Sequence, residues 1–276
     1  MPVEIELEEC DYADGWCGRY SGSTEIDGEF EEDDESLRRY ILRTFGMAER
    51  ARMNITSCNE DDGCQCMKRQ LYEHICDNWS NFTTSHMDKL SHIVRQGIPE
   101  DMRMKMWQLM VEGLVERMQR YPGLFDKLKG SESGNEQAIE RDLHRTFPRD
   151  PMFLHSGGKG QTGLFNVLNA YACFDHKVGY AQGMGFIVGF FLMYMDEETT
   201  FWLLVSLMQE TRSLYRLRLL FGPGIGGFHL MIYQIDQLIH QYLPQVAAHL
   251  KEGGIGTDVW AAPYIPSLFV GRVPRQ

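Results

Sequence analysis

The longest apolar stretch of the chain is Gly183-Met-Gly-Phe-Ile-Val-Gly-Phe-Phe-Leu-Met-Tyr-Met195, and Asp196, Glu197 and Glu198 follow it directly. Its 13 residues are fewer than the roughly 20 that a helix needs to span a bilayer. We therefore predict a helix that is buried in the core of a globular domain. The three glycines in the stretch indicate that neighbouring helices approach it closely.

Helical spacing of apolar residues continues on both sides of this stretch. Pro99 suits the first turn of a helix. The apolar stripe that follows it is Met102, Met106, Trp107, Met110, Val111, Leu114, Val115 and Met118. Further helices are expected at Leu164, Leu168 and Tyr171, over residues 201–208, and along Phe228, Met231, Ile232, Ile235, Ile239 and Tyr242, with Pro244 past the end. Alternation typical of strands is lacking, so the predicted fold class is all-α.

The sequence divides into three predicted segments. Residues 1–35 are acidic and are expected to form a disordered tail. Residues 36–70 are expected to hold a short amphipathic helix, followed by a polar, cysteine-bearing loop over 54–66. Leu71, Ile75 and Trp79 restart the helical spacing, so residues 71–276 are predicted to form the main domain.

Charge and cysteine content exclude several classes of protein. Residues 1–90 carry 21 Asp and Glu against 9 Lys and Arg, whereas residues 91–276 carry 18 of each. No segment supplies the basic patch of a nucleic-acid binder, and the acidic segment would be repelled by anionic membranes. The seven cysteines are irregularly spaced and no signal peptide is evident, which indicates a cytoplasmic protein with at most peripheral membrane association.

Four short patterns match nucleotide or metal motifs only in part. Residues 222–227 fit G-x-G-x-x-G, but a helical pattern precedes them and no acidic residue follows at the required distance. Residues 157–160 lack the Walker spacing, and residues 58–69 lack both terminal carboxylates of a calcium loop. Cys64, Cys66, His74 and Cys76 could ligate zinc, but the spacing of the first pair fits free thiols better.

Three other segments carry a stronger signal together. The first is Arg95-Gln-Gly97-Ile98-Pro99-Glu-Asp-Met-Arg103-Met-Lys-Met-Trp107, which we read as a loop and a helix start with Trp107 packed inward. The second is Ile139-Glu-Arg-Asp142-Leu-His-Arg145-Thr-Phe-Pro148. Pro148 predicts a helix end close to Arg145, and the spacing places Asp142 and Arg145 on one helix face. Taken alone, this pair would be an ordinary surface ion pair.

The third segment is Tyr180-Ala-Gln182-Gly183-Met184. Gly179 and Gly183 bracket it, so we expect Gln182 to lie in a turn that enters the buried helix. A glutamine amide can donate and accept hydrogen bonds at once, which suits holding a water molecule. Taken alone, Gln182 would be a polar loop residue.

In order and spacing, these segments resemble the three signature motifs of the TBC family of Rab GTPase-activating proteins. The resemblance covers residues 71–269, and residues 160–250 are most similar to the Evi5-type branch. It implies an all-helical domain that acts in trans on a GTP-bound Rab-family GTPase. It also implies a role in vesicle trafficking and recruitment of the cytoplasmic protein to endomembranes. The chain would need no cofactor, because the partner carries GTP and Mg²⁺.

The resemblance also assigns residue roles. Arg145 would be an arginine finger, Gln182 would orient the attacking water, Asp142 would hold Arg145, and Tyr180 with Gly183 would shape the glutamine turn. Arg95, Gly97, Ile98, Pro99, Arg103 and Trp107 would be structural.

The match departs from the family at its C-terminal end. Pro263 and Pro266 are expected to break a helix that family members carry there, and the family's last helices are missing. The resemblance therefore implies a C-terminally incomplete domain. Two functions stay open at this point: a GTPase activator, or a catalytically weak Rab-binding or scaffolding module.

Overall fold

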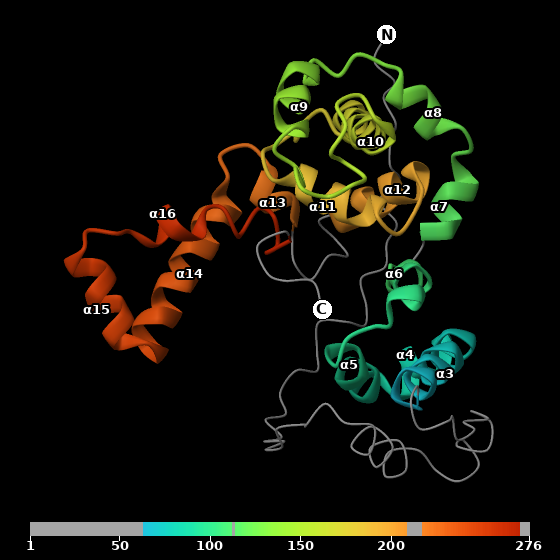
Figure 1. Ribbon diagram of the computed structural model, residues 1–276, viewed down its shortest axis with the longest axis horizontal. Helices are drawn as coiled ribbons and strands as arrows, with labels where there is room; N and C mark the ends of the chain where they lie inside the picture. The colour runs from blue at the N-terminus through green and yellow to red at the C-terminus, as the bar shows by residue number, and fades with distance from the viewer. Residues whose placement is uncertain (1–62, 112–113, 209–216, 271–276) are drawn as a thin grey trace. The chain divides into compact units, whose positions relative to one another are not determined.

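The computed structural model describes residues 63–111, 114–208 and 217–270, with side chains from residue 68 onward (Figure 1). Within these ranges every regular element is a helix, which confirms the predicted all-α class. None of these helices is long and apolar enough to cross a membrane. The predicted acidic tail, and the predicted linker as far as residue 62, lie outside the described residues.

The helices are bounded as follows: α3 (Gly63–Asp77), α4 (Trp79–Ser85), α5 (Met87–Arg95), the 3₁₀ helix η1 (Glu100–Met102), α6 (Arg103–Met110), α7 (Leu114–Arg120), α8 (Leu124–Lys129), α9 (Glu136–Leu143), α10 (Lys159–Phe174), α11 (Met184–Leu192), α12 (Glu197–Met208), α13 (Leu217–Phe221), α14 (Gly226–Tyr242), α15 (Pro244–Glu252) and α16 (Thr257–Ala261).

The core forms around α10, which packs against α8, α9, α11 and α12 (Figure 1). Both α10 and α12 are apolar on most of their circumference, and a helix of that composition is stable only when it is buried. Trp202 of α12 and Tyr171 of α10 are among the largest fully buried side chains. Burying each such side chain stabilises the fold by about 2 kcal/mol.

The apolar stretch that begins at Gly183 forms the predicted buried helix, α11, which ends at Leu192. Its glycines allow the close approach that the sequence predicted. A Cβ atom added at Gly185 would lie 3.0 Å from Thr146 Oγ1, and one added at Gly189 would lie 3.0 Å from the ring of Phe147. The segment after α9 therefore packs directly on the backbone of α11.

Two predicted boundaries are wrong. The single helix expected along Met102–Met118 is split into η1, α6 and α7, with Val111 in an extended conformation. Val111 is β-branched, and β-branched side chains fit an extended backbone better than a helix. The loop expected over 54–66 is also too long, because α3 begins at Gly63 and runs through the cysteine pair.

The C-terminal helices follow the predicted pattern. α14 covers the expected stripe, and Phe228, Met231 and Ile232 pack against the core. Pro244 occupies the first turn of α15, where proline is well tolerated. α16 ends at Ala261, two residues before Pro263, as the sequence predicted.

We expect Gly160→Ala to lower the free energy of unfolding by about 1–3 kcal/mol, the usual cost of overpacking. The added Cβ would overlap the backbone oxygen of Met152, which cannot move as a side chain can. Gly226→Ala is the matched control, because it also lies in a helix and has no atom within 4 Å of the added Cβ. Urea unfolding of both variants measures the difference, and equal stability of the two would contradict the packing described for α10.

Candidate functional site

Asp142 and Arg145 lie at the C-terminal end of α9, where the chain leaves the helix in a tight turn. The Arg145 amide donates to the Asp142 carbonyl at 3.3 Å, and the Thr146 amide donates to the Leu143 carbonyl at 3.2 Å. The Thr146 hydroxyl donates to the same Asp142 carbonyl at 2.8 Å. Phe147 then adopts a positive φ of 49° before Pro148, so the helix ends close to where the sequence predicted.

The guanidinium of Arg145 binds the carboxylate of Asp142 through two parallel hydrogen bonds. Nε donates to Oδ1 at 2.8 Å, and Nη2 donates to Oδ2 at 2.6 Å. This bond raises the pKa of Arg145, so the side chain is positively charged throughout the physiological range. The Arg145 side chain is 46% exposed, whereas that of Asp142 is 16% exposed. The pair therefore presents its cationic half to solvent.

Tyr180 holds the same carboxylate from the other side. Its hydroxyl donates to Asp142 Oδ2 at 2.5 Å. Burial is the main cause that raises the pKa of Tyr180, and the bond to Asp142 raises it further. The hydroxyl therefore stays protonated and acts as the donor in this bond.

Gln182 lies against the guanidinium. With its side-chain oxygen turned toward Arg145, that oxygen accepts from Nη1 at 3.1 Å and from Nη2 at 3.3 Å. Gly183 follows with a φ of 104°, a conformation that side chains rarely adopt. A Cβ at Gly183 would also lie 2.6 Å from Cβ of Pro266, so this turn has room only for glycine.

These contacts join the second and third sequence segments in one cluster, which we define as Asp142, Arg145, Tyr180 and Gln182. Asp142 Oδ2 accepts from both Arg145 and Tyr180, and Arg145 in turn donates to Gln182. The sequence placed these residues in two separate segments, and the structure brings them together on the exposed end of α9.

The first segment lies elsewhere, and its side chains dock α6 on the C-terminal end of α11. Arg103 Nε donates to the Ile98 carbonyl at 3.2 Å, and Arg103 Nη1 donates to the Tyr194 hydroxyl at 2.6 Å. Trp107 packs its ring against Phe190, Phe191 and Tyr194, with centroid distances of 5.5, 5.6 and 5.1 Å.

The backbone of the first segment is also held in place. Arg95 ends α5, and Pro99 precedes η1. The Tyr72 hydroxyl donates to the Gly97 carbonyl at 3.2 Å. None of these residues contributes a bond to the cluster.

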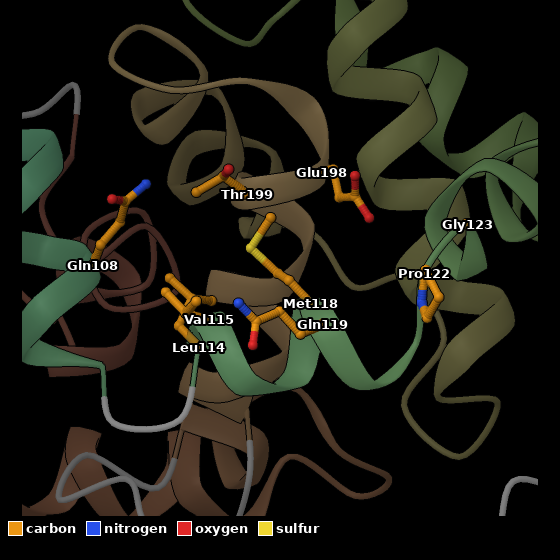
Figure 2. A pocket seen from close by; sticks show the side chains of 9 residues that line it. All are labelled: Gln108, Leu114, Val115, Met118, Gln119, Pro122, Gly123, Glu198 and Thr199. Atoms are coloured by element: carbon orange, nitrogen blue, oxygen red, sulfur yellow. The ribbon is translucent and has the colours of Figure 1, made fainter.

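Figure 2 shows a pocket on the described part of the chain. Side chains of α7, together with Gln108, Glu198 and Thr199, line it. Asp142, Arg145, Tyr180 and Gln182 do not line it. The cluster therefore lies outside this pocket, on the surface at the end of α9.

Sequence reasoning missed three residues that shape the cluster. The Thr146 hydroxyl donates to the Asp142 carbonyl, Pro266 lies against Gly183, and Asn135 accepts a hydrogen bond from the Tyr180 amide. Asn135 and Pro266 make their contacts across 45 and 83 positions of sequence, and no local pattern reports such a contact. The zinc alternative rests on Cys64 and Cys66, whose side chains lie outside the described residues.

Residues 100–276 match the family model of the Rab-GTPase-TBC domain. The chain belongs to this family. Rab GTPase-activating protein tbc-11 of Caenorhabditis elegans is 32% identical over 216 residues, which cover 77% of this chain and 22% of that protein. Ecotropic viral integration site 5 protein homolog of Homo sapiens is 33% identical over 204 residues, covering 74% of this chain and 24% of that protein. The chain thus spans about a quarter of the length of these relatives, and it has the predicted Evi5-like relatives.

The TBC fold is also seen in a solved structure. The crystal structure of the Chlamydomonas flagellar RabGAP TBC domain matches with a TM-score of 0.58 and 23% identity, covering 80% of this chain and 74% of that chain. At this identity the likeness concerns the fold of the TBC domain alone.

We expect Tyr180→Phe to destabilise this TBC domain by about 1 kcal/mol, because a half-buried carboxylate oxygen loses its hydroxyl donor. Tyr233→Phe is the matched control, since Tyr233 is 62% exposed on α14. The free energy of unfolding in urea measures both variants. Equal stability of the two would show that the bond between Tyr180 and Asp142 contributes nothing to the fold.

Proposed function

We propose that this TBC domain accelerates GTP hydrolysis by a Rab-family GTPase in its GTP-bound form. Arg145 and Gln182 are the two groups that it supplies in trans. The observation that carries the proposal is the cluster itself, in which one exposed guanidinium is bound by Asp142 and lies within 3.1 Å of the Gln182 oxygen.

Arg145 has the charge and the geometry for the proposed role. A phosphoryl group in transfer accumulates negative charge on its oxygens, and a positioned arginine stabilises that charge. The two bonds to Asp142 hold the planar guanidinium in one orientation, so little side-chain entropy remains to be lost when the partner binds. An arginine finger of this kind accelerates hydrolysis by about 10³–10⁵-fold.

Gln182 is proposed to orient the attacking water. Its amide offers one acceptor and one donor group at the same edge, which suits a water that must be held and aimed. The contact with Arg145 places the amide beside the cation. Both groups could then reach one γ-phosphoryl group and the water that attacks it, which is the arrangement that in-line displacement needs.

The nucleotide and its Mg²⁺ would belong to the partner. The glycine-rich segment 222–227 follows α13, a helix, and therefore lacks the strand that a dinucleotide fingerprint requires. We place this activity in vesicle trafficking, in the cytoplasm or on the cytoplasmic face of endomembranes. The name of the relative tbc-11, a Rab GTPase-activating protein, supports the class of partner.

The test is single-turnover GTP hydrolysis by a panel of purified GTP-loaded Rabs, with and without the chain. We expect one or more Rabs to be stimulated, and Arg145→Ala to remove about 10³–10⁵-fold of that stimulation. Gln182→Ala should also abolish most of it. Arg145→Lys should fail as well, because lysine lacks the planar fork that binds Asp142 in two places.

Arg149→Ala and Gln137→Ala are the matched controls. Both side chains are exposed; Gln137 lies on α9, Arg149 follows it, and neither belongs to the cluster. Both variants should stimulate hydrolysis as the wild type does. A folded wild-type sample that binds a GTP-loaded Rab without stimulating it would overturn the catalytic proposal in favour of a binding or scaffolding module.

A further inference from the structure

The turn that carries Gln182 is held to α9 at a second point, outside the three sequence segments. The backbone amide of Tyr180 donates to Oδ1 of Asn135 at 3.3 Å. We propose that Asn135 is a positioning residue for Gln182, fixing the glutamine turn relative to the arginine at the other end of α9. This inference rests on the proposed function.

Asn135 stands at the N-cap of α9, where asparagine ordinarily accepts a hydrogen bond from the first turn of its own helix. Its side chain makes no such bond here. The side-chain oxygen accepts instead from Tyr180, 45 positions away. A residue well suited to local capping thus uses its acceptor for a long-range contact, which indicates a role beyond the helix end.

The amide of Asn135 is fixed in the orientation that this bond requires. Nδ2 donates to the Ser133 carbonyl at 3.1 Å, and the backbone amide of Asn135 donates to the Ser133 hydroxyl at 3.1 Å. The carboxylate of Glu136 accepts from the Ser133 amide at 2.6 Å and from the Gly134 amide at 3.2 Å. These hydrogen bonds hold the turn before α9 in one conformation, and Oδ1 of Asn135 faces the turn that carries Gln182.

Gly179 completes the fit on the side of the glutamine turn. Its φ is 60°, and an added Cβ would lie 3.2 Å from Oδ1 and 3.3 Å from Nδ2 of Asn135. The side-chain amide of Asn135 therefore packs directly against the backbone just before Tyr180. A larger residue at position 179 would displace it.

Tyr180 is consequently tied to both ends of α9. Its amide binds Asn135 before the first residue of the helix, and its hydroxyl binds Asp142 in the last turn. Two such points fix both the position and the rotation of the turn along the helix. Gln182 lies two residues further on, so its distance from Arg145 depends on both attachments.

The competing explanation is that Asn135 merely favours the start of α9. Two substitutions separate the explanations. Asn135→Ser keeps a good N-cap residue but is too short to reach the Tyr180 amide. Asn135→Asp keeps an acceptor oxygen of the same reach and is also a good N-cap residue, but it loses the Nδ2 bond to the Ser133 carbonyl. A capping role predicts that both variants behave like the wild type, whereas a positioning role predicts that Asn135→Asp stays closer to the wild type than Asn135→Ser does.

The experiment measures two quantities on the full chain. The first is hydrogen exchange at the Tyr180 amide by NMR, which reports the bond itself and needs no partner. The second is single-turnover GTP hydrolysis with the Rab that the wild type stimulates, alongside affinity for that Rab loaded with a non-hydrolysable GTP analogue. Asn78→Ser is the matched control. Asn78 is the N-cap of α4, and its side chain donates to the His74 carbonyl, only four positions away, and not to a distant segment.

We expect Asn135→Ser to speed exchange at Tyr180 and to slow stimulated hydrolysis by roughly 10–100-fold, since a shift of about 1 Å in a catalytic group has effects of that size. Affinity for the Rab should change little, and Asn135→Asp should recover part of the rate. Asn78→Ser should match the wild type in every measurement.

Different results would overturn different claims. Unchanged exchange at Tyr180 in Asn135→Ser, or rates that are alike for Asn135→Ser and the wild type, would overturn the role of Asn135 while the proposed function stands. Equal loss of rate in Asn135→Ser and Asn135→Asp, with slow exchange at the Tyr180 amide retained in Asn135→Asp, would do the same. A wild-type chain that stimulates no Rab would instead overturn the proposed function, and with it the positioning role.

Discussion

The candidate site depends on the hydrogen bonds that the carboxylate of Asp142 accepts. One of its oxygens accepts from both Arg145 at 2.6 Å and Tyr180 at 2.5 Å, and these two residues lie on either side of α10 in the sequence. A half-buried carboxylate must find donors or lose the free energy of its hydration. By taking one donor from each segment, Asp142 fixes the end of α9 to the glutamine turn. Charge-assisted bonds of this kind are shorter and stronger than neutral ones, so the geometry that they set is well defined.

Helix α11 explains why the three sequence segments occur together in one domain. Gln182 immediately precedes it, and Gly183, with its φ of 104°, is its N-cap. The chain after Arg145 packs against its middle at Gly185 and Gly189. Trp107 packs against its C-terminal end. One buried helix therefore receives a contact from each segment, and side chains that are far from the cluster support its position through packing.

The sequence predicted the elements whose signals are local, and it missed those that depend on distant contacts. The run from Gly183 had to be buried because it is apolar on every face, and Pro148 had to end α9 because proline restricts the residue before it. The break at Val111 was missed because the apolar spacing continues across it, whereas the helical conformation of the backbone ends there. The bond from Tyr180 to Asn135 joins positions 45 apart, and neither residue carries a mark of it in its own neighbourhood. Which carboxylate Arg145 binds was predictable from the spacing of three positions, because the turn that follows α9 keeps Arg145 on the side of Asp142.

A second group made of an aspartate, an arginine and a tyrosine shows what distinguishes the cluster from an ordinary structural ion pair. Arg218 binds Asp175, and the Tyr171 hydroxyl donates to that carboxylate at 3.0 Å, but here the arginine side chain is only 22% exposed. This pair joins α13 to the end of α10, and both of its side chains are largely covered. Arg145 is 46% exposed, and an ion pair at that exposure contributes only about 0–1 kcal/mol. An arginine finger that accelerates hydrolysis 10³–10⁵-fold gains about 4–7 kcal/mol in the transition state. The gain in the transition state thus far exceeds what the ion pair contributes to stability. Under the proposed mechanism, Arg145 keeps both bonds to Asp142, which hold its orientation, and offers Nη1, which Asp142 does not bind, to a phosphoryl oxygen.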